Sequence, residues 1–347
     1  MTILHIVPEH PNKADIALSI ANGLQKSHQI DSTFYCLDKL DEYSRILYGF
    51  DVINTPLSSL TENTPSSITT VILHVYYATY RALNNKNDSH DFITQLKKTV
   101  EQRSLKLITI FHDIPTNRLH SLFIINPLHQ SLTKQLAELS TSVITNNTFY
   151  QQHLNKNANK NTISVNHFSR VGELKSNNLL GASRCDLVIL GGVERADIYK
   201  KKSFLKQASE ALKINQIVDI GEPLNWDKID TKGLNVRQMG SLIKSDISNQ
   251  LTISKVGIMD YSRYPSCLGK SSAFNAFKAH GVAPLLLNDI GRKSDDIISG
   301  VNYFTPKDLE TLKSNRTIAR MAHTNYAHYQ THNKEQWVKL IKDLIIN

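Results

Sequence analysis

The sequence contains little cysteine, no long apolar run and no leader-like start. Only Cys36, Cys185 and Cys267 occur among its 347 residues. This odd, widely spaced set excludes a disulfide framework and a cysteine-based zinc ribbon, and it fits a reducing cytoplasm. No apolar run reaches the roughly 18 residues that a membrane-spanning helix needs. Because no charged segment precedes a long apolar stretch at the N-terminus, we expect no signal peptide. These absences predict a cytoplasmic protein.

Acidic side chains are outnumbered, and the imbalance lies in the second half of the chain. A composition of 40% hydrophobic and 20% charged residues is that of a folded protein, and the length predicts two domains. Residues 1–165 carry 14 basic and 13 acidic side chains, and residues 166–347 carry the other 26 and 18. The second half can therefore attract an anionic ligand or surface, although an ordinary basic surface is the simpler alternative.

The distribution of the basic residues argues against nucleic acid as a partner. They are scattered, with Lys200–Lys202 as the longest run, and no RNP, KH, zinc-finger or basic-zipper motif accompanies them. A nucleotide diphosphate or an anionic membrane face needs only a few placed cations and helix N-termini. We therefore expect a nucleotide-like ligand and no nucleic acid, with peripheral contact to an anionic membrane surface as a further hypothesis.

Strand-like and helix-like segments alternate in the first half of the chain. Apolar runs predict strands over Ile3–Val7, Val71–Val75, Leu105–Phe111 and Ser142–Thr145, with helices over 13–27, 92–103 and 128–139. A polar segment rich in turn formers, 166–184, is typical of a linker. Strands alternating with helices imply a parallel sheet that is covered on both faces.

The same alternation resumes after the linker. We expect strands over Asp186–Leu190, Ile217–Ile220, around Val236, over Val256–Met259 and over Val282–Leu287, with helices over 202–213, 245–253 and 270–279 and a helical stretch over 307–346. The fold class is therefore α/β, with two doubly wound domains. Ligands of such domains bind at the carboxyl ends of the strands, so a cleft between the two would hold one substrate on each side.

A Gly-Lys-Ser-Ser turn, Gly269–Ser272, opens one of the predicted helices. Backbone N–H groups, Lys270 and the hydroxyls of Ser271 and Ser272 converge there, which is good geometry for a phosphate. The segment is not a Walker A loop, because Tyr264 stands where the first glycine of that motif would lie. The alternative, an ordinary capped helix with a solvent-exposed lysine, stays open.

The order of these segments resembles the GT-B-fold glycosyltransferases, above all the family 4-type class, also called glycosyl transferases group 1. The resemblance is carried by Thr109–Asp113, Val143–Asn146, Leu190–Arg195, Ile217–Pro223, Val236–Gly240 and Gly269–Gly281. It implies two Rossmann-like domains that face a central cleft, with the C-terminal helix crossing back to the N-terminal domain. The acceptor-binding domain would span 1–168, joined by the helix at about 333–347, and the nucleotide-sugar-binding domain would span 182–332.

The sequence differs from this family at the family's E-x7-E glutamates. When Ala279–Gly281 is set on the family's A-x-G, the two glutamates fall at Cys267 and Asn275. Asn275 can still hydrogen-bond the hydroxyls of a donor ribose, because an amide both donates and accepts. Cys267 offers no equivalent of the first glutamate. The donor sugar and the stereochemical outcome therefore do not follow from the resemblance.

The resemblance implies a donor site in the second domain that works without a metal ion or other cofactor. The departing nucleotide develops negative charge, and GT-B enzymes meet it with cationic side chains and helix N-termini. The residues that we expect at the nucleotide-sugar donor are Gly192, Arg195, Lys200, Gly269, Lys270, Ser271, Ser272 and Asn275.

Three residues of the first domain are candidates for catalysis. His112 follows a predicted strand, where it would contact the donor sugar or assist proton transfer. Asp113 and Asp15 lie at strand–helix junctions, and one of them would be the general base of an inverting enzyme. For each an ordinary role stays open: a hydrogen-bonded loop histidine for His112, a turn former for Asp113 and a helix N-terminal charge for Asp15.

Together these features predict a glycosyltransferase that moves a sugar from a nucleotide-diphosphate-sugar donor to a carbohydrate or lipid-linked acceptor. Cell-surface polysaccharide or glycan assembly, at the inner face of the membrane, would be a typical setting. The missing glutamates keep a second hypothesis open, a GT-B-like binding or partner subunit without transfer activity. A third, a sugar-nucleotide epimerase of the GT-B type, lacks the glutamate, aspartate and histidine pattern that such enzymes carry.

Overall fold

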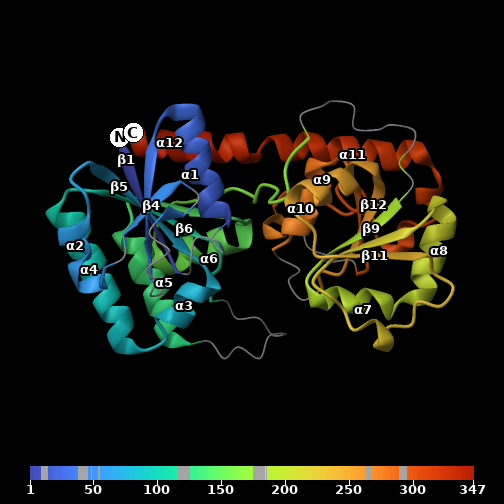
Figure 1. Cartoon of the computed structure of the whole chain (residues 1–347), viewed down its shortest axis with the longest axis horizontal. Coiled ribbons are helices and arrows are strands. Elements are labelled where there is room, and N and C mark those ends of the chain that lie inside the picture. The colour runs from blue at the N-terminus through green and yellow to red at the C-terminus, as the bar shows by residue number, and fades with distance from the viewer. Residues whose placement is uncertain are drawn as a thin grey trace. The chain divides into compact units, whose positions relative to one another are not determined.

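The chain forms two compact units, each built on its own sheet (Figure 1). A computed structural model describes residues 1–8, 15–37, 46–47, 49–53, 55–115, 126–174, 184, 186–262, 267–288 and 295–347. Unit 1 consists of Met1–Val165 and Lys334–Asn347, and unit 2 consists of Asn166–Asn333. Cys185 and Tyr264 lie outside the described residues.

The sheet of unit 1 has eight strands in the order β3-β4-β2-β1-β5-β6-β7-β8. The strands are β1 (Thr2–Val7), β2 (Asp31–Cys36), β3 (Ile46–Leu47), β4 (Phe50–Ile53), β5 (Ile68–Val75), β6 (Lys106–Phe111), β7 (Ser142–Thr145) and β8 (Thr162–Ser164). Only the edge pair β3–β4 is antiparallel among these pairings. The chain moves outward from β1 in both directions, so unit 1 is doubly wound, with its switch point beside β1.

Helices cover both faces of this sheet. They are α1 (Asp15–His28), α2 (Leu60–Asn63), α3 (Tyr77–Ala82), α4 (Lys86–Gln102), α5 (Pro127–Leu139), α6 (Thr148–Ala158) and the C-terminal α12 (Lys334–Ile346). Right-handed crossovers in opposite directions from β1 place α1 on one face and α4, α5 and α6 on the other. Val7 of β1 accordingly packs with Ala17 and Ala21 of α1. This packing identifies the face of β1 that the odd-numbered residues share.

The C-terminal helix belongs to unit 1, as the fold class predicted. Helix α12 runs alongside α1, and its Trp337 is fully buried (Figure 1). Lys106 at the start of β6 donates from Nζ to the carbonyl oxygen of Ile345, at 3.0 Å. The last helix thus completes the core of the unit in which the chain begins.

Unit 2 has a five-stranded parallel sheet in the order β11-β10-β9-β12-β13. Its strands are β9 (Asp186–Gly191), β10 (Ile217–Gly221), β11 (Val236–Gly240), β12 (Ser254–Met259) and β13 (Ala283–Leu286), and its helices are α7 (Ala196–Tyr199), α8 (Lys202–Leu212), α9 (Lys244–Ile253), α10 (Ser272–Ala279) and α11 (Asn315–Gln330). Leu187 and Ile189 of β9 join one apolar cluster, and Val188 and Leu190 join or pack on another. Alternate residues of this strand therefore enter two cores, one on each face of the sheet.

Several elements differ from the sequence-based expectation. β2 was missed because its sequence, DSTFYC, begins with three polar residues, although Ser32 and Thr33 are buried. Helix α6 was missed because its polar residues surround few apolar ones. The expected helical stretch 307–346 is two short 3-10 turns followed by α11 and α12, which are separated at 331–333. No helix among the described residues combines the length and apolar character that crossing a bilayer requires.

Candidate active site

The carboxyl ends of β9 and β10 in unit 2 are two adjoining glycine turns. Gly191 is paired with Gly221 in the register of these strands. Gly221 has a φ of +147°, and a Cβ atom there would lie 1.9 Å from the carbonyl oxygen of Gly191. No side chain fits in that space, so the close approach of the two turns requires glycine. Gly192, one of the expected donor residues, follows directly and begins the 3-10 turn Val193–Arg195.

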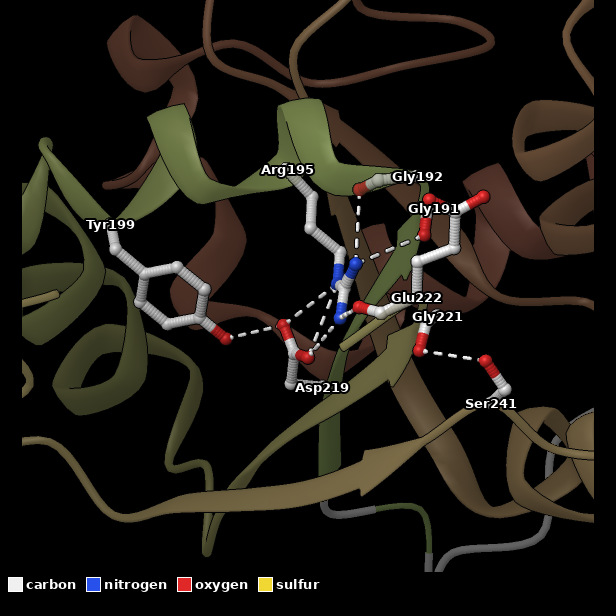
Figure 2. Close-up of polar contacts among 8 residues, drawn as sticks. All are labelled: Gly191, Gly192, Arg195, Tyr199, Asp219, Gly221, Glu222 and Ser241. Atoms are coloured by element: carbon white, nitrogen blue, oxygen red, sulfur yellow. Dashed lines mark hydrogen bonds and ion pairs between the residues drawn. The ribbon is translucent and has the colours of Figure 1, made fainter. Parts of the chain in front are cut away.

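The guanidinium of Arg195 connects these two turns (Figure 2). Its Nε lies 3.1 Å from both carboxylate oxygens of Asp219, and Nη2 donates to Oδ1 of Asp219 at 2.8 Å. Nη1 donates to the carbonyl oxygens of Gly191 and Gly192 at 3.2 and 3.0 Å, and Nη2 donates to that of Glu222 at 2.7 Å. The five N–H donors of the guanidinium are thus matched by five acceptor positions of the protein itself.

This buried ion pair organises the turns from within the sheet. Arg195 and Asp219 have only 3% and 1% of their side chains exposed, and Tyr199 donates a further hydrogen bond of 2.7 Å to Oδ2 of Asp219 (Figure 2). Burial, reinforced by the negative charge of Asp219, raises the pKa of Tyr199 well above its ordinary value, so its hydroxyl remains a donor. A buried pair needs this full set of partners, because an unmatched charge there is costly.

The expected role of Arg195 was to contact the donor directly. The structure places its guanidinium on protein acceptors, where it holds the backbone of the turns. Lys200, expected beside it, is 77% exposed and lies 2.6 Å from Asp197 in an ion pair. Lys200 at the C-terminal end of α7 thus extends into solvent, whereas Arg195 at its N-terminal end is enclosed.

A cavity of about 680 Å³ adjoins α7 and the segment after β10. Three lysines, Lys200, Lys202 and Lys228, line it together with Asp197 and Asp230. Lys202 pairs with Asp230 at 2.7 Å, at the exposed surface. The cavity therefore combines exposed, paired charges with residues next to the turns that Arg195 holds.

The expected phosphate turn lies at the start of α10. The segment Leu268–Lys270 forms a 3-10 turn, and Ser271 caps α10 by accepting a hydrogen bond from the N–H of Phe274 at 3.2 Å. Ser272 is exposed and Lys270 is half-buried. The first N–H groups of a helix, here those of Ser272 and its neighbour Ala273, have no intrahelical carbonyl partner and can bind an anion.

Asn275 is fully buried one turn into α10. Its Nδ2 donates to the carbonyl oxygens of Gly269 and Ser271, at 2.7 and 3.0 Å. Its Oδ1 is buried and has no hydrogen-bond partner among the described residues. Asn275 therefore fixes the phosphate turn with its amide nitrogen and keeps an acceptor oxygen beside it.

Two further buried side chains, those of Asp295 and Asn166, enclose Gly269. Its N–H donates to Oδ2 of Asp295 at 3.1 Å, and a Cβ atom there would lie 2.3 Å from Oδ1 of Asn166 and 2.7 Å from Oδ2 of Asp295. Both neighbours are buried. Any larger residue at position 269 would have to displace them, so glycine here serves a close approach.

Beneath this turn lies a buried lysine that the sequence analysis did not single out. Nζ of Lys278, on α10, lies 3.1 Å from Nε2 of His332. Burial lowers the pKa of Lys278 to about 7, against a smaller opposing effect from Asp295. Burial, followed by the charge of Lys278, lowers the pKa of His332 well below its ordinary value. The last turn of α10 therefore contains a buried amine, which is linked to the phosphate turn through Asp295.

The expected catalytic residues of unit 1 lie at the ends of its strands. His112 and Asp113 follow β6, and the N–H groups of both point to the carbonyl oxygen of Val75, at 2.8 and 3.2 Å. Oδ2 of Asp113 accepts a hydrogen bond of 3.2 Å from the N–H of Tyr77 at the start of α3. Asp15 is the first residue of α1, where its negative charge is favourable. Asp113 and Asp15 thus each serve a helix N-terminus.

His112 is 3% exposed and stands at the end of a row of three histidines. Its Nε2 lies 3.1 Å from Nδ1 of His74, and Nε2 of His74 lies 3.1 Å from Nδ1 of His5. The ring of Tyr76 stacks on His112, with 4.1 Å between centroids. The sequence analysis missed His5 and His74. Each lies within a strand-like run of the sequence. That both face the same side of the sheet becomes clear only once strand order and register are known.

Each unit thus gathers expected residues at its own sheet edge. In unit 2, Gly192, Arg195 and Lys200 belong to one turn and its helix, and the residues from Gly269 to Asn275 form a second cluster. In unit 1, His112 and Asp113 are adjacent, and Asp15 lies on another element. No group of three or more histidine, cysteine, aspartate or glutamate side chains is placed to hold a metal ion within the part of the chain that the structure describes.

Comparison with known proteins finds similarity of structure without similarity of sequence. No protein-family model matches the chain, and no curated protein matches it. An alpha-glucosyltransferase in complex with UDP and a 13-mer DNA has a TM-score of 0.59 at 13% identity, over 100% of this chain and 99% of that one. UDP-GlcNAc 2-epimerase from Neisseria meningitidis, bound to UDP-GlcNAc, has a TM-score of 0.60 at 14% identity, over 100% of both chains.

A third similar structure is TarM from S. aureus, solved with Fondaparinux, alpha-GlcNAc-glycerol and UDP. Its TM-score is 0.56 at 10% identity, over 84% of this chain and 58% of that one. By their names, two of these neighbours are a glucosyltransferase and an epimerase. With two doubly wound Rossmann-like units and the C-terminal helix returning to unit 1, this chain has the GT-B fold.

Proposed function

We propose that the protein is a glycosyltransferase that uses a nucleotide-diphosphate-sugar donor. The observation that carries this proposal is the cationic, N–H-rich turn at the start of α10, which lies at the carboxyl edge of a Rossmann-like sheet in a GT-B fold. Structures of the same fold hold UDP or UDP-GlcNAc. Ligands of doubly wound sheets bind at this edge.

In this proposal unit 2 holds the donor. Lys270, the hydroxyl of Ser272 and the first N–H groups of α10 contact the diphosphate, and the exposed Lys200 contributes a second cation. Their positive charge stabilises the nucleotide as its bond to the sugar breaks, so no metal ion is needed. Arg195 contributes indirectly, because it holds the turns of Gly191 and Gly221.

Unit 1 supplies the acceptor side of the reaction. We place His112 at the donor sugar or at the acceptor hydroxyl, since it stands at the carboxyl edge of the sheet beside Tyr76. Asp113 and Asp15 are the candidate general bases if the enzyme inverts, although Asp113 also serves the N-terminus of α3. The family 4-type class remains the proposed relationship, and Asn275 stands in place of its ribose-binding glutamate with an unpaired acceptor oxygen.

A panel of nucleotides tests the donor site first. The purified protein is titrated with UDP, GDP, ADP, dTDP and CMP and with their sugar conjugates, and its thermal unfolding temperature is measured. A ligand at 100 times its dissociation constant stabilises the fold by about 2.7 kcal/mol. We expect one nucleoside diphosphate and its sugar to raise the unfolding temperature. Stabilisation by none of them, with and without candidate acceptors, would contradict the proposal.

A second candidate function, a GT-B-type epimerase, is favoured by the likeness to UDP-GlcNAc 2-epimerase over the full length of both chains. Both activities are read in one experiment, in which the stabilising nucleotide sugar is incubated with the protein and followed by NMR. Transfer or hydrolysis releases the nucleoside diphosphate with the sugar retained or inverted at its anomeric carbon. Epimerisation changes the configuration at another carbon of the sugar. Binding without either product, also in the presence of candidate acceptors, supports the other hypothesis, a non-catalytic partner subunit.

The acceptor is proposed to be a carbohydrate or a lipid-linked glycan of a cell-surface polysaccharide pathway. Fondaparinux and alpha-GlcNAc-glycerol occupy one structure of the same fold, and DNA occupies another. Radiolabelled donor is therefore offered with glycan fractions, lipid extracts and duplex DNA in parallel. Label in the glycan or lipid fraction supports the proposal, and label in DNA alone would overturn it.

Peripheral binding to an anionic membrane is the remaining part of the proposal. Its support is the excess of basic residues in 166–347, 26 against 18 acidic ones. Co-sedimentation with liposomes should increase with the fraction of anionic lipid and decrease with salt, because the attraction is electrostatic. Sedimentation that depends on neither would contradict membrane binding without affecting the donor site.

A further inference from the structure

Four polar residues of unit 1 form a diagonal row across four neighbouring strands. In the register of the sheet, Ser32 of β2 is paired with Ile3 of β1, and His5 is two residues further along. His5 is paired with Ile72 of β5, and His74 is again two residues further. His74 is paired with Ile110 of β6, and His112 follows two residues later. Because alternate residues share one face, all four side chains lie on the same side of the sheet.

This side of the sheet is the one that α1 covers. Val7, two residues after His5, packs with Ala17 and Ala21 of α1, and Phe34, the register partner of His5, joins the same cluster. Each step of the row advances by one pleat toward the carboxyl edge. The row therefore leads from the interior of unit 1 to His112, the residue at that edge that we propose for catalysis.

Hydrogen bonds join the row from end to end. Oγ of Ser32 lies 3.3 Å from Nε2 of His5. The two contacts between the rings, from His5 to His74 and from His74 to His112, are both 3.1 Å and both join an Nδ1 to an Nε2. Adjacent rings are also stacked, with centroids 5.4 Å apart in both pairs. No more than 3% of His5, His74 or His112 is exposed to solvent.

Neutral rings are favoured at His5 and His74. Burial lowers the pKa of His5 to about 3. Burial, followed by the charge of His5, lowers the pKa of His74 well below its ordinary value. A neutral imidazole has one N–H donor and one acceptor nitrogen, so each ring can donate in only one direction along the row.

The direction of one bond therefore fixes all the others. If Nδ1 of His5 donates to Nε2 of His74, then His74 carries its proton on Nδ1 and donates to Nε2 of His112, which carries its own proton on Nδ1. If the first bond runs the other way, all three protons lie on Nε2. In either case the three rings share one tautomer, and Ser32 can donate or accept at the start of the row.

We propose that His5 and His74 are positioning residues that fix the ring orientation and the tautomer of His112. The row determines whether Nδ1 of His112 donates a hydrogen bond or accepts one, because Nε2 is committed to His74. Nδ1 of His112 is buried, so the fixed tautomer suits it to one role, donor to a sugar oxygen or acceptor of a hydroxyl proton, where a substrate reaches this atom. The catalytic consequence rests on the proposed function, whereas the shared tautomer does not.

Nitrogen NMR of the ring atoms tests the shared tautomer on the full-length protein. Histidine labelled with ¹⁵N distinguishes Nδ1–H, Nε2–H and doubly protonated rings by their nitrogen shifts and long-range couplings. Signals are assigned by their loss in His5→Phe, His74→Phe and His112→Phe. At pH 7 we expect three neutral rings with the proton on the same nitrogen. Opposite tautomers in any two of the three, or a doubly protonated ring, would overturn the proposal in the wild-type protein alone.

A variant then tests the coupling between the rings. His74→Phe keeps the ring stack and removes both hydrogen bonds, so the ¹⁵N signals of His112 should shift toward a mixture of tautomers. Ile72→Val, on the same strand and the same face, removes one methylene and leaves the row intact, and it should leave these signals unchanged. Unchanged His112 signals in His74→Phe would contradict the coupling.

Turnover separates this inference from the proposed function. If the protein transfers sugar, His74→Phe should lower kcat while the KM for the donor stays as in Ile72→Val, because the donor binds to unit 2. If the three rings share one tautomer but the protein shows no turnover, the inference about the row stands and the proposed transferase function fails. If the protein turns over but the tautomers differ, the transferase function stands and the inference about the row fails.

Discussion

The two sheets present their carboxyl edges in physically different ways. In unit 1 burial keeps His5 and His74 of the row neutral, and hydrogen bonds join His5 to His74 and His74 to His112. In unit 2 the corresponding edge depends on buried charge, with Arg195 and Asp219 nearly inaccessible to solvent. Both solutions place a polar group at the edge of an apolar sheet, where ligands of doubly wound folds bind.

Because of this difference, the two edges should respond differently when one interaction partner is removed by substitution. A buried ion pair leaves an uncompensated charge when one member is removed, whereas a neutral hydrogen bond leaves an unsatisfied dipole. The edge of unit 2 should therefore be the more easily damaged by substitution. The edge of unit 1 should tolerate substitution better, and the first property that it loses should be the fixed direction of the hydrogen bonds in the histidine row.

The largest expected effect is that of Asp219→Ala. Loss of this carboxylate leaves the guanidinium of Arg195 buried without its counter-ion, which should lower the free energy of unfolding of unit 2 by about 3–5 kcal/mol. His74→Phe, which removes two neutral hydrogen bonds, should cost unit 1 about 1–3 kcal/mol. The comparison would fail if the two losses were equal or reversed.

The two tryptophans allow each unit to be followed separately. Trp337 is buried in α12 of unit 1, and Trp226 packs edge-on against Tyr199 of unit 2, at 5.3 Å between centroids. Urea unfolding is recorded by fluorescence in Trp337→Phe, which reports unit 2, and in Trp226→Phe, which reports unit 1. Asp230→Ala is the matched control, because it removes an exposed partner of Lys202 and should leave the midpoint unchanged.

Much of this fold could be predicted from sequence, because the buried strands are continuous apolar runs. β5, β6, β9 and β12 were all expected within a few residues of their observed bounds. Strand β2 was not, since Ser32 and Thr33 occupy buried positions where an apolar residue would have signalled a strand. Ser32 contacts His5 at the start of the histidine row, so a residue that hid the strand also takes part in the row.

The site was predictable only where chemistry is local in sequence. The turn from Gly269 to Ser272 begins a helix, as its short motif predicted, and its role at a donor stays a prediction. Arg195 was singled out as well, but its enclosure by Asp219 depends on a residue of a neighbouring strand. Nothing in the spacing of His5 and His74 marks them, because their contact arises from strand order and register.

The second prediction concerns the donor site of unit 2. Lys270→Ala removes the cation nearest the N-terminus of α10, and a charge-assisted hydrogen bond of about 1.5–3 kcal/mol would be lost with it. The dissociation constant for the stabilising nucleotide should therefore rise by roughly 10- to 150-fold in calorimetric titration. Lys206→Ala, an exposed lysine on α8 of the same unit, should change it little. Unchanged affinity in Lys270→Ala would remove this residue from the site.

The last prediction is a pH dependence that only unit 2 should show between pH 7 and 9. Burial lowers the pKa of Lys278 to about 7 from its ordinary 10.5, so the unfolded chain binds more protons than the folded one between these values. Stability must then rise with pH, by at most about 1.4 kcal/mol per pH unit. In unit 1 burial lowers the pKa of His5 to about 3 and that of His74 well below its ordinary value, so both are neutral when folded. In the unfolded chain both are mostly neutral above pH 7, because the ordinary pKa of histidine is about 6.5.

Lys278→Met provides the control, since it keeps the length of the side chain and removes the amine. Urea midpoints reported by Trp226 should rise from pH 7 to pH 9 in the parent and stay level in this variant, while midpoints reported by Trp337 stay level in both. The groups that face Lys278 are His332, His328 and Asp295, and burial already keeps both histidines neutral in this range. A level response in unit 2 of the parent would mean that Lys278 stays charged in the folded state. In that case its amine must find a counter-charge, and Asp295, which also accepts from the N–H of Gly269, would tie the phosphate turn to a buried ion pair.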